Sequence, residues 1–363
     1  MNTFGKTIGL TIFGESHGLS IGAVLDGLPS GEAIDWNAVR AEMARRAPGK
    51  NQMSTARSEK DAFEVQSGFF NGYTTGTPLC AIIRNSDQHS RDYDQLRHLM
   101  RPGHADYSGK IRYGGFNDYR GGGHFSGRLT APLVFAGAVA SQILARHGIT
   151  VGSHILRLAG IADKPFTAIG ETAETLQALK KETLPVLDKA QAGPMEEKIL
   201  AAKNDLDSVG GVIECMVTGL PAGIGDPFFD SVESHLSHMM FSVPAVKGIE
   251  FGDGFSLAEL RGSQANDAFY YDGDVVKTRT NHNGGINGGI TNGMPVVFRL
   301  AIKPTASISQ KQETIDTDTK ENCDLVIKGR HDPCIVQRAI PVVEAAAAWA
   351  ILDVCLSEKG RCW

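Results

Sequence analysis

The chain has 363 residues, of which 42% are hydrophobic and 21% charged, and it carries a formal net charge of −5. This composition describes a folded protein with a large core, organised as one large domain or two smaller ones. It excludes a general nucleic-acid binder, because no surplus of cations exists to release counterions from a phosphate backbone.

The apolar patterning predicts strands and helices in alternation along the chain. In chain order we expect strands at 7–13 and 21–26, a helix at 35–46, a strand at 79–84, a long apolar helix after Arg128, helices near 171–181 and 195–206, a strand at 212–217, a helix at about 229–241, a strand at 295–302 and a second long apolar helix after Arg338. The two long helices are apolar nearly all round, which places them in the interior. Gly148 and Gly360 stand where C-terminal caps belong, and Pro341 fits a first helical turn.

Short sequence patterns occur twice and in the same order. A Gly-Leu-Pro-x-Gly turn at 27–31 recurs at 219–223, GTPL at 76–79 corresponds to GMPV at 293–296, and PLVxAxA at 132–138 corresponds to PVVxAxA at 341–347. These matches predict two related halves, about 1–150 and 208–363, with a helical connector at 151–207, within a single domain over 1–363. We expect an α+β fold in which central helices are covered by mixed sheets.

The cysteine pattern and the termini suggest a cytoplasmic location. The six cysteines show neither a CxxC pair nor zinc-type spacing with histidine, so we expect reduced thiols and no metal site; they are Cys80, Cys215, Cys323, Cys334, Cys355 and Cys362. No basic-then-apolar signal pattern begins the chain. The longest charge-free apolar stretch of the C-terminal helix, 345–352, is too short to span a bilayer.

Two histidines lie in glycine-bracketed polar segments, GESHG at 14–18 and RPGHADY at 101–107. Histidine exchanges a proton at low cost near neutral pH, and neighbouring glycines let the backbone approach a ligand closely. A lone histidine in such a setting would more often cap a turn or fill a polar pocket. Two of them, each followed by glycine-rich sequence, favour proton transfer by His17 and His104.

Five arginines in glycine-rich or polar contexts are candidate anion-binding residues; they are Arg45, Arg46, Arg128, Arg330 and Arg338. Arg128 follows GGGHFSG at 121–127, where free backbone N–H groups at a helix start can bind phosphate or carboxylate. Arg45 and Arg46 close a helix, and the alternative is that they only complement its C-terminal end. Arg330 belongs to KGRHDPC at 328–334, where a local salt bridge with Asp332 is an equal alternative.

Two further segments could contact a ligand. KPTAS at 303–307 ends a strand with a lysine and two hydroxyls and could grip a phosphate, while NHNGGINGG at 281–289 could lie under a flat ring or simply turn the chain. A Walker loop and a GxGxxG fingerprint are both missing, so ATP and a Rossmann dinucleotide site are not supported. The residues alone therefore indicate an enzyme that binds a polyanionic small molecule and transfers protons with two histidines.

Four blocks in order show that the sequence resembles the chorismate synthase family over essentially its whole length: GESHG at 14–18, RPGHADY at 101–107, YRGGG at 119–123 and KGRHDPC at 328–334. The resemblance implies conversion of 5-enolpyruvylshikimate 3-phosphate to chorismate by 1,4-elimination of phosphate, the last common step of the shikimate pathway to aromatic amino acids. It further implies a requirement for reduced FMN, a β-α-β sandwich with pseudo-two-fold symmetric halves, and a homotetramer. NADPH is a candidate reductant of the flavin, and the sequence leaves open whether the chain uses it.

The resemblance also implies roles for individual residues. His17 would serve the departing phosphate, His104 would protonate the reduced flavin near N1, and Asp332 would relay a proton at flavin N5. The implied substrate-binding positions are Ser16, Arg45, Arg46, Arg128, Arg330 and Arg338. The implied cofactor-binding positions are Arg46 (for NADPH as well), His124, Phe125, Ser126, Ala245, Gly288, Lys303, Pro304, Thr305, Ala306, Ser307 and Arg330.

This chain departs from the family pattern at three places. HFSGRLT at 124–130 replaces the widespread RSSARET, Ala47 stands where a third arginine is common, and Gln52 stands where an arginine is frequent. These changes leave the contacts to flavin phosphate and NADPH open. Two alternative functions remain, namely a flavin-dependent oxidoreductase acting on a phosphorylated metabolite and a non-catalytic flavin- or anion-binding homologue.

Overall fold

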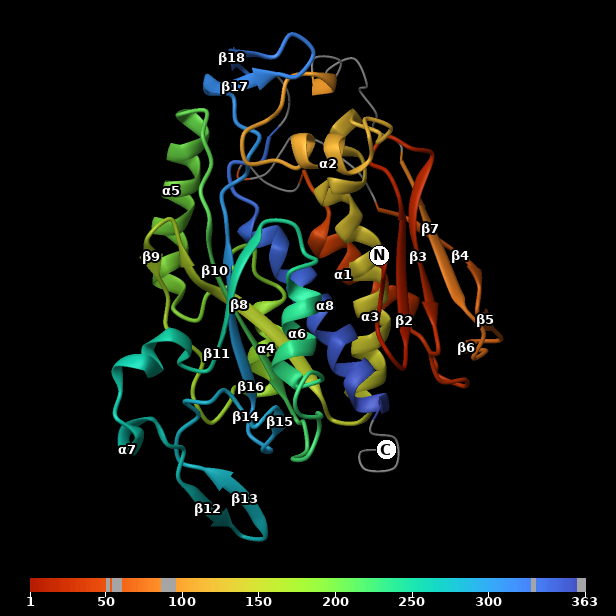
Figure 1. Ribbon diagram of the computed structural model, residues 1–363. Coiled ribbons are helices and arrows are strands. Elements are labelled where there is room, and N and C mark those ends of the chain that lie inside the picture. The colour runs from red at the N-terminus through yellow and green to blue at the C-terminus, as the bar shows by residue number, and fades with distance from the viewer. Residues whose placement is uncertain (50–52, 54–60, 86–95, 328–330, 358–363) are drawn as a thin grey trace.

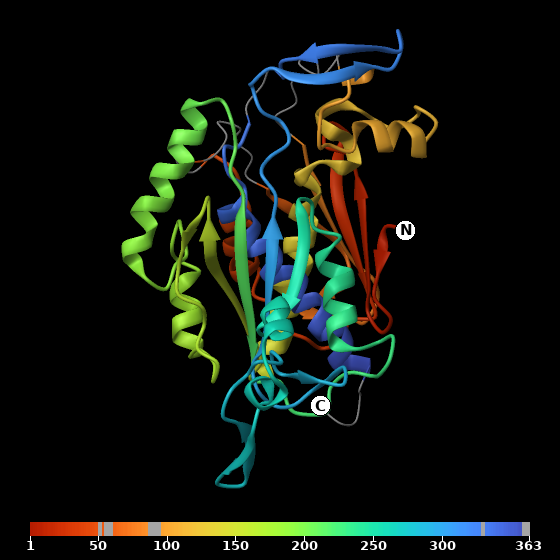
Figure 2. The ribbon, with the colours of Figure 1, turned by 60° about the vertical axis from the view of Figure 1, so that its left-hand side comes forward.

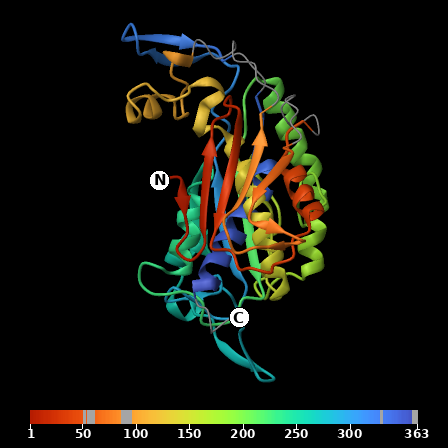
Figure 3. The same cartoon turned by 90° about the vertical axis from the view of Figure 1, so that its right-hand side faces the viewer.

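Two five-stranded sheets enclose a layer of helices (Figure 1). The computed structural model describes residues 1–49, 53, 61–85, 96–327 and 331–357. Strands run in the order β1-β2-β3-β7-β4 in the first sheet and β11-β16-β10-β8-β9 in the second. The turned views in Figures 2 and 3 show the same three layers from the sides of the second and the first sheet.

The first sheet consists of β1 (Thr3–Phe4), β2 (Gly9–Gly14), β3 (Ser20–Asp26), β4 (Phe63–Ser67) and β7 (Leu79–Arg84), and the second of β8 (Thr150–Leu158), β9 (Ile161–Ala162), β10 (Gly211–Thr218), β11 (Val246–Phe251) and β16 (Val296–Ile302). The helices are α1 (Trp36–Arg46), α2 (Asp106–Arg112), α3 (Thr130–Arg146), α4 (Ala173–Leu179), α5 (Ala192–Asn204), α6 (Val232–Met240), α7 (Gly262–Ala265) and α8 (Val336–Ser357). Four small hairpins complete the described chain: β5 (Phe69–Phe70) with β6 (Tyr73–Thr74), β12 (Phe269–Asp272) with β13 (Val275–Thr278), β14 (Ile286–Asn287) with β15 (Ile290–Thr291), and β17 (Gln312–Asp316) with β18 (Glu321–Leu325).

The core lies between the sheets, around α3 and α8. In β3 the alternating residues Ile21, Ala23 and Leu25 are fully buried and face this helix layer, as period-two patterning requires. Gly137 of α3 lies against Ala345 of α8, and a Cβ at position 137 would collide with the backbone there. These two small residues let the long helices pack closely. Both helices lie in the interior, where an apolar surface on every face is buried.

The two halves of the chain follow the same path. The first half runs through β2, β3, α1, β4, β7 and α3, and the second runs through β8, β10, α6, β11, β16 and α8. The four strands named for each half are numbered here by their order along the chain. Across each sheet they lie in the order first, second, fourth, third, namely β2-β3-β7-β4 and β8-β10-β16-β11. The α+β sandwich with internal duplication is therefore confirmed. The second copy of this order begins at β8 (Thr150–Leu158), a strand that carries none of the repeated turn patterns and that we had expected within the connector.

Two expectations about the elements are wrong. Both five-stranded sheets are antiparallel throughout their described pairings, not mixed. An antiparallel neighbour can be reached through a hairpin or a returning loop, whereas a parallel neighbour needs a long crossover connection. Pro341 lies inside α8, because the helix already begins at Val336. Gly148 follows α3 with a φ of +74°, as a C-terminal cap should, whereas Gly360 lies outside the described residues.

Two helical segments, Gly127–Arg146 and Val336–Ser357, are long and apolar enough to cross a membrane by length and composition alone. Within the fold, however, 83% and 100% of their hydrophobic windows are buried. Their apolar surface is thus used in the core between the sheets, as the sequence predicted from their all-round hydrophobicity.

Candidate active site

A cavity of about 830 Å³ lies where α3 and α8 begin. Its walls come from both halves of the chain: β1, the turn at 101–105, the glycine-rich loop with the start of α3 at 121–130, the loop at 241–247, the strand end at 303–307 and residues 331–342. Most of the segments singled out in the sequence therefore meet at one place, although they are spread over more than 300 residues of chain.

The triple glycine at 121–123 lies against both predicted catalytic histidines. All three glycines have positive φ, between 53° and 85°. A Cβ at Gly121 would overlap the imidazole of His17, and a Cβ at Gly122 would lie 3.2 Å from Cε1 of His104. Only glycine combines this backbone conformation with so close an approach to the two rings.

His104 is held by an ion pair. Its Nδ1 lies 2.7 Å from Oδ1 of Asp106, and Arg101 donates to the same carboxylate from Nε and Nη2, each at 2.7 Å. Burial acts to raise the pKa of Asp106, but the hydrogen bonds from Arg101 and His104 hold that pKa well below its usual range. The ionised carboxylate orients the imidazole, which lines the cavity.

His17 and Ser16 are both buried beside the glycine-rich loop. Ser16 is fully buried and its backbone N–H donates to the carbonyl of Gly123 at 3.1 Å. The hydroxyl of Ser16 has no hydrogen-bond partner among the described residues. A ligand group that reached this hydroxyl would therefore satisfy it. His17 is 4% exposed, and its imidazole lies against Gly121, a residue of the cavity wall.

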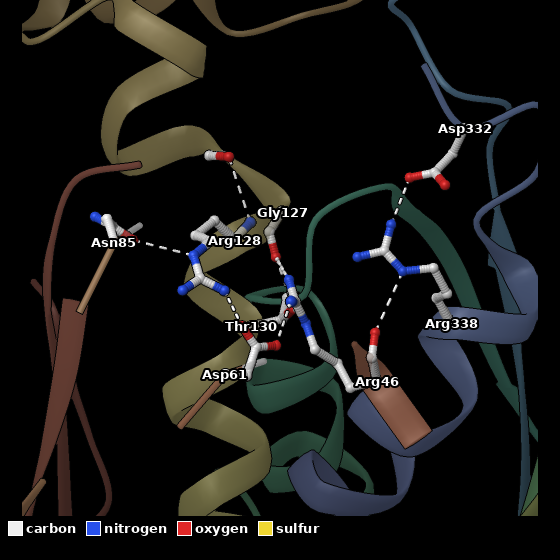
Figure 4. A network of polar contacts seen from close by, with 9 residues as sticks. Arg46, Asp61, Asn85, Gly127, Arg128, Thr130, Asp332 and Arg338 are labelled. Carbon is white, nitrogen blue, oxygen red and sulfur yellow. Dashed lines mark hydrogen bonds and ion pairs between the residues drawn. The ribbon is translucent and has the colours of Figure 1, made fainter. Parts of the chain in front are cut away.

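Arg46 and Arg128 converge on Asp61 (Figure 4). Nη1 of Arg46 lies 2.9 Å from Oδ2 of Asp61, while Nη1 of Arg128 pairs with Oδ1. Arg46 also donates to the hydroxyl of Thr130 at 3.0 Å and the carbonyl of Gly127 at 2.6 Å. Burial lowers the pKa of Arg46 to about 10, with the positive charges of Arg338 and Arg128 acting in the same direction. Two guanidinium groups thus meet at one carboxylate beside the cavity.

Arg338 joins this cluster from the second half. Its Nη1 lies 2.5 Å from Oδ2 of Asp332, and its Nε donates to the backbone carbonyl of Arg46 at 3.3 Å (Figure 4). The carboxylate of Asp332 thus contacts Arg338, and the alternative of a local pair between Asp332 and Arg330 stays a prediction. Arg330 itself, and Gln52, lie outside the described residues.

Four of the predicted site residues that the structure describes are absent from the cavity wall. Ser16 and His17 lie against Gly121 of the glycine-rich loop, and Arg45 and Gly288 lie elsewhere. Arg45 pairs with Glu42 and with buried Glu344, each at 2.5 Å, on a different side of α1 from Arg46. Successive residues on a helix point about 100° apart, so Arg45 and Arg46 leave α1 in different directions. Gly288 lies in the β14–β15 hairpin, which Figure 1 shows at the opposite end of the second sheet from the start of α8.

The remaining predicted cofactor positions line the cavity: His124, Phe125, Ser126, Ala245, Lys303, Pro304, Thr305, Ala306 and Ser307. His124 bonds through Nδ1 to the carbonyl of Gly14 at 2.8 Å, and the hydroxyl of Ser126 caps the turn before α3 by accepting from the Arg128 N–H. The buried hydroxyl of Thr305 has no hydrogen-bond partner in the described part of the chain. An unpaired polar atom beside a lysine fits a phosphate-bearing ligand.

Sequence reasoning missed four residues that shape this site. Arg101, Asp106 and His331 stand inside motifs we quoted, and the two-residue spacing of His104 and Asp106 could have suggested their pairing. Asp61 had no local signal, since its partners Arg46 and Arg128 are distant in sequence. No cluster of metal-ligating side chains occurs among the described residues, and the five cysteines found there are free thiols.

The duplicated sandwich holds a cavity whose wall includes Arg46, Arg128, Arg338 and His104. The chain belongs to the chorismate synthase family, whose family model matches residues 8–356.

Curated relatives support the same assignment over the full length. The chain is 44% identical to a chorismate synthase of Dehalococcoides mccartyi, covering 98% of this chain and 96% of the relative. It is 43% identical to one from Methanosarcina mazei, covering 97% and 95%. A solved structure described as a chorismate synthase aligns with a TM-score of 0.76 and 28% identity, over 99% of this chain and 95% of that one.

Proposed function

We propose that this protein converts 5-enolpyruvylshikimate 3-phosphate to chorismate as a carbon–oxygen lyase. The bond from ring carbon 3 to the phosphate oxygen breaks, a proton leaves carbon 6, and a second ring double bond forms. The observation that carries the proposal is the glycine-rich loop lying against both His17 and His104, beside a cavity lined by Arg46, Arg128 and Arg338.

The arginines suit a substrate with two carboxylates and a phosphate. Arg128 and Arg46 bring two guanidinium groups to the cavity wall, and their N–H groups suit the oxygens of an anionic ligand. His17, next to Gly121 of the glycine-rich loop, would serve the departing phosphate as a proton donor. Hydrogen-bond donors positioned where negative charge develops in the transition state usually make the largest single contribution to catalysis.

Reduced FMN is the proposed cofactor, and the described residues fit it. The strand end 303–307, with its lysine and the unpaired hydroxyl of Thr305, and the backbone around 124–126 would hold the flavin. When bound, reduced FMN supplies electron density that assists carbon–oxygen cleavage, without net oxidation. His104 would hold or release a proton at the flavin, and Asp332, oriented by Arg338, would do so at a second ring position.

We extend the proposal to NADPH as the external reductant, to a homotetrameric assembly and to a cytoplasmic location, all from the family resemblance. Each nitrogen of the Arg46 guanidinium already donates to a protein acceptor. A role of Arg46 toward NADPH would therefore require its remaining N–H groups. Chorismate formation from oxidised FMN and NADPH under anaerobic conditions would establish this reductase activity.

An anaerobic assay with reduced FMN and 5-enolpyruvylshikimate 3-phosphate separates the candidate functions. We expect phosphate and chorismate to appear in equal amounts while the flavin spectrum remains that of the reduced form. Flavin oxidation in step with turnover would instead indicate an oxidoreductase. Binding of both molecules without phosphate release would indicate a non-catalytic homologue.

A further inference from the structure

The imidazole of His104 belongs to a chain of side chains that reaches from one half of the molecule to the other. Nη1 of Arg101 lies 3.2 Å from the hydroxyl of Ser307, at the strand end of the second half. The same guanidinium makes a two-point contact with Asp106, and Asp106 in turn meets Nδ1 of His104 at 2.7 Å. The linked residues are Ser307, Arg101, Asp106 and His104.

The geometry determines which nitrogen of His104 carries hydrogen. An ionised carboxylate has only acceptor oxygens, so a contact of 2.7 Å with Nδ1 requires a proton on that nitrogen. Nη2 of Arg101 lies 3.1 Å from the same Nδ1, but it is itself a donor and bonds the shared oxygen Oδ1 of Asp106 at 2.7 Å. Both donors therefore converge on one acceptor, and Nε2 is the nitrogen left for proton exchange.

Burial makes this arrangement rigid. The side chains of Arg101 and Asp106 are only 6% and 8% exposed, and that of His104 is 18% exposed. Asp106 also accepts from the backbone N–H of Arg101 at 3.1 Å, which fixes the carboxylate at the start of α2. On its other side the His104 ring rests on Gly122, where a Cβ would approach both Cε1 and Nε2.

We propose that Asp106 is a positioning residue for the reaction: supported by Arg101, it holds His104 in the Nδ1–H tautomer with Nε2 directed to the ligand cavity. When Nε2 takes up a proton, the positive charge that appears on the ring is balanced by the carboxylate of Asp106. When Nε2 gives that proton up, the ring returns to the same tautomer without rotating. The turnover part of this inference rests on the proposed function, whereas the tautomer part does not.

Asp106→Asn tests the inference with almost no change of shape. The amide nitrogen of asparagine would donate to Nδ1, so the neutral ring would carry its proton on Nε2 instead. Nitrogen-15 NMR of histidine-labelled full-length protein, at alkaline pH and without flavin, distinguishes the two tautomers. The His104 signal is assigned by its loss in His104→Gln. We expect the Nδ1–H form in the wild type and in Asp106→Glu, and the Nε2–H form in Asp106→Asn.

Turnover and substrate affinity should separate in the same variant. We expect Asp106→Asn to lower kcat by ~10²–10⁴-fold, the usual value of a correctly placed acid or base, with KM changed less than about threefold. Glu64→Gln is the control. Glu64 forms a two-point pair with Arg84, at 2.8 and 3.3 Å, and neither residue lines the cavity.

Three outcomes would overturn the proposal. A wild-type His104 with its proton on Nε2 does so without any variant, and this test stands even if Asp106→Asn fails to fold. A reversed tautomer with wild-type kcat would show that the tautomer is irrelevant to turnover. An equal loss of kcat in Glu64→Gln would show a general effect of breaking arginine–carboxylate pairs. A wild-type protein that shows the Nδ1–H form but no lyase activity would remove the proposed function and leave the assignment of the tautomer intact.

Discussion

Two buried ion clusters in this molecule have opposite composition. Near the cavity, the carboxylate of Asp61 lies between the guanidinium groups of Arg46 and Arg128. In the second sheet, the imidazole of His154 lies between two carboxylates, 3.0 Å from Asp163 and 3.0 Å from Glu214. The first is a cation–anion–cation cluster and the second an anion–cation–anion cluster.

The difference between them lies in how the remaining charge is satisfied. In the second sheet, Glu214 also accepts from Arg299 at 2.8 Å and from the backbone N–H of Phe166 at 2.6 Å, so that cluster is internally balanced. In the Asp61 cluster the two guanidinium groups border the cavity, where an anionic ligand could approach them. Buried charge is costly unless paired, so cations at a cavity wall fit a site for an anion. We therefore expect the first cluster to serve ligand binding and the second to serve stability.

The largest expected effect contrasts the two predicted catalytic histidines with His154. His17→Ala or His104→Ala should lower turnover by ~10²–10⁴-fold, because each would remove a positioned proton donor or acceptor. His154→Gln should leave the turnover of the folded fraction unchanged, since His154 is buried in β8 between Asp163 and Glu214. Phosphate-release kinetics with matched concentrations of folded protein measure both. Wild-type turnover in the two alanine variants would remove the distinction.

Removal of the Asp61 carboxylate should be the largest effect on stability. Asp61→Asn leaves two buried guanidinium groups without their shared counterion, and we expect the free energy of unfolding to fall by about 3–5 kcal/mol. Urea unfolding at neutral pH measures this difference. Glu64→Gln, which breaks the exposed pair with Arg84, serves as the control and should have little effect.

The pH dependence of the Asp61 contribution has a defined sign. Burial acts to raise the pKa of Asp61, but Arg46 and Arg128 outweigh it and hold that pKa below its usual value. The stabilisation is thus present above the unfolded pKa of about 3.9 and is lost as pH falls through the lower folded pKa. The free energy of unfolding of Asp61→Asn should not show this decrease at low pH. If the decrease persisted in the variant, it would come from other carboxylates.

The His154 cluster should show the reverse pH dependence, with a smaller amplitude. Burial acts to lower the pKa of His154, but hydrogen bonds to Asp163 and Glu214 raise it above the ordinary value. The contribution is present below the unfolded pKa of about 6.5 and is lost as pH rises through the folded pKa. His154→Gln should cost about 1.5–3 kcal/mol near pH 6 and less in alkali. A constant difference across pH would mean that the ring is not held as a cation.

The smallest expected effect distinguishes the arginines by their position. Arg128→Ala should weaken substrate binding by about 1.5–3 kcal/mol, and Arg128→Lys should restore only part of it, because an ammonium cannot make a planar two-point contact. Arg45→Gln should leave KM within about twofold, because Arg45 is paired with Glu344 outside the cavity. Steady-state KM values decide this; equal losses at positions 45 and 128 would argue for a long-range field effect.

The sequence was informative where chemistry is encoded locally. His17, His104 and the triple glycine were recognisable because glycine beside a polar residue marks a close approach. Arg45 and Arg46 could not be separated, since only the orientation of α1 decides which one faces the cavity. Asp61 could not be found, because its partners are brought to it by the tertiary fold. The strand β8 was missed because it corresponds to β2 of the first half only by its position in the sheet, and no repeated turn motif marks it.

The common direction of α3 and α8 has a consequence for how a ligand arrives. Both helices begin at the cavity and run away from it through the core (Figure 1). Each helix start carries the equivalent of roughly half a positive elementary charge, so the backbone itself adds to the potential at the site. An anion approaching a molecule of net charge −5 is repelled overall but is attracted along this one axis. Association should therefore slow as ionic strength rises, even though the residues in contact with the bound ligand stay the same.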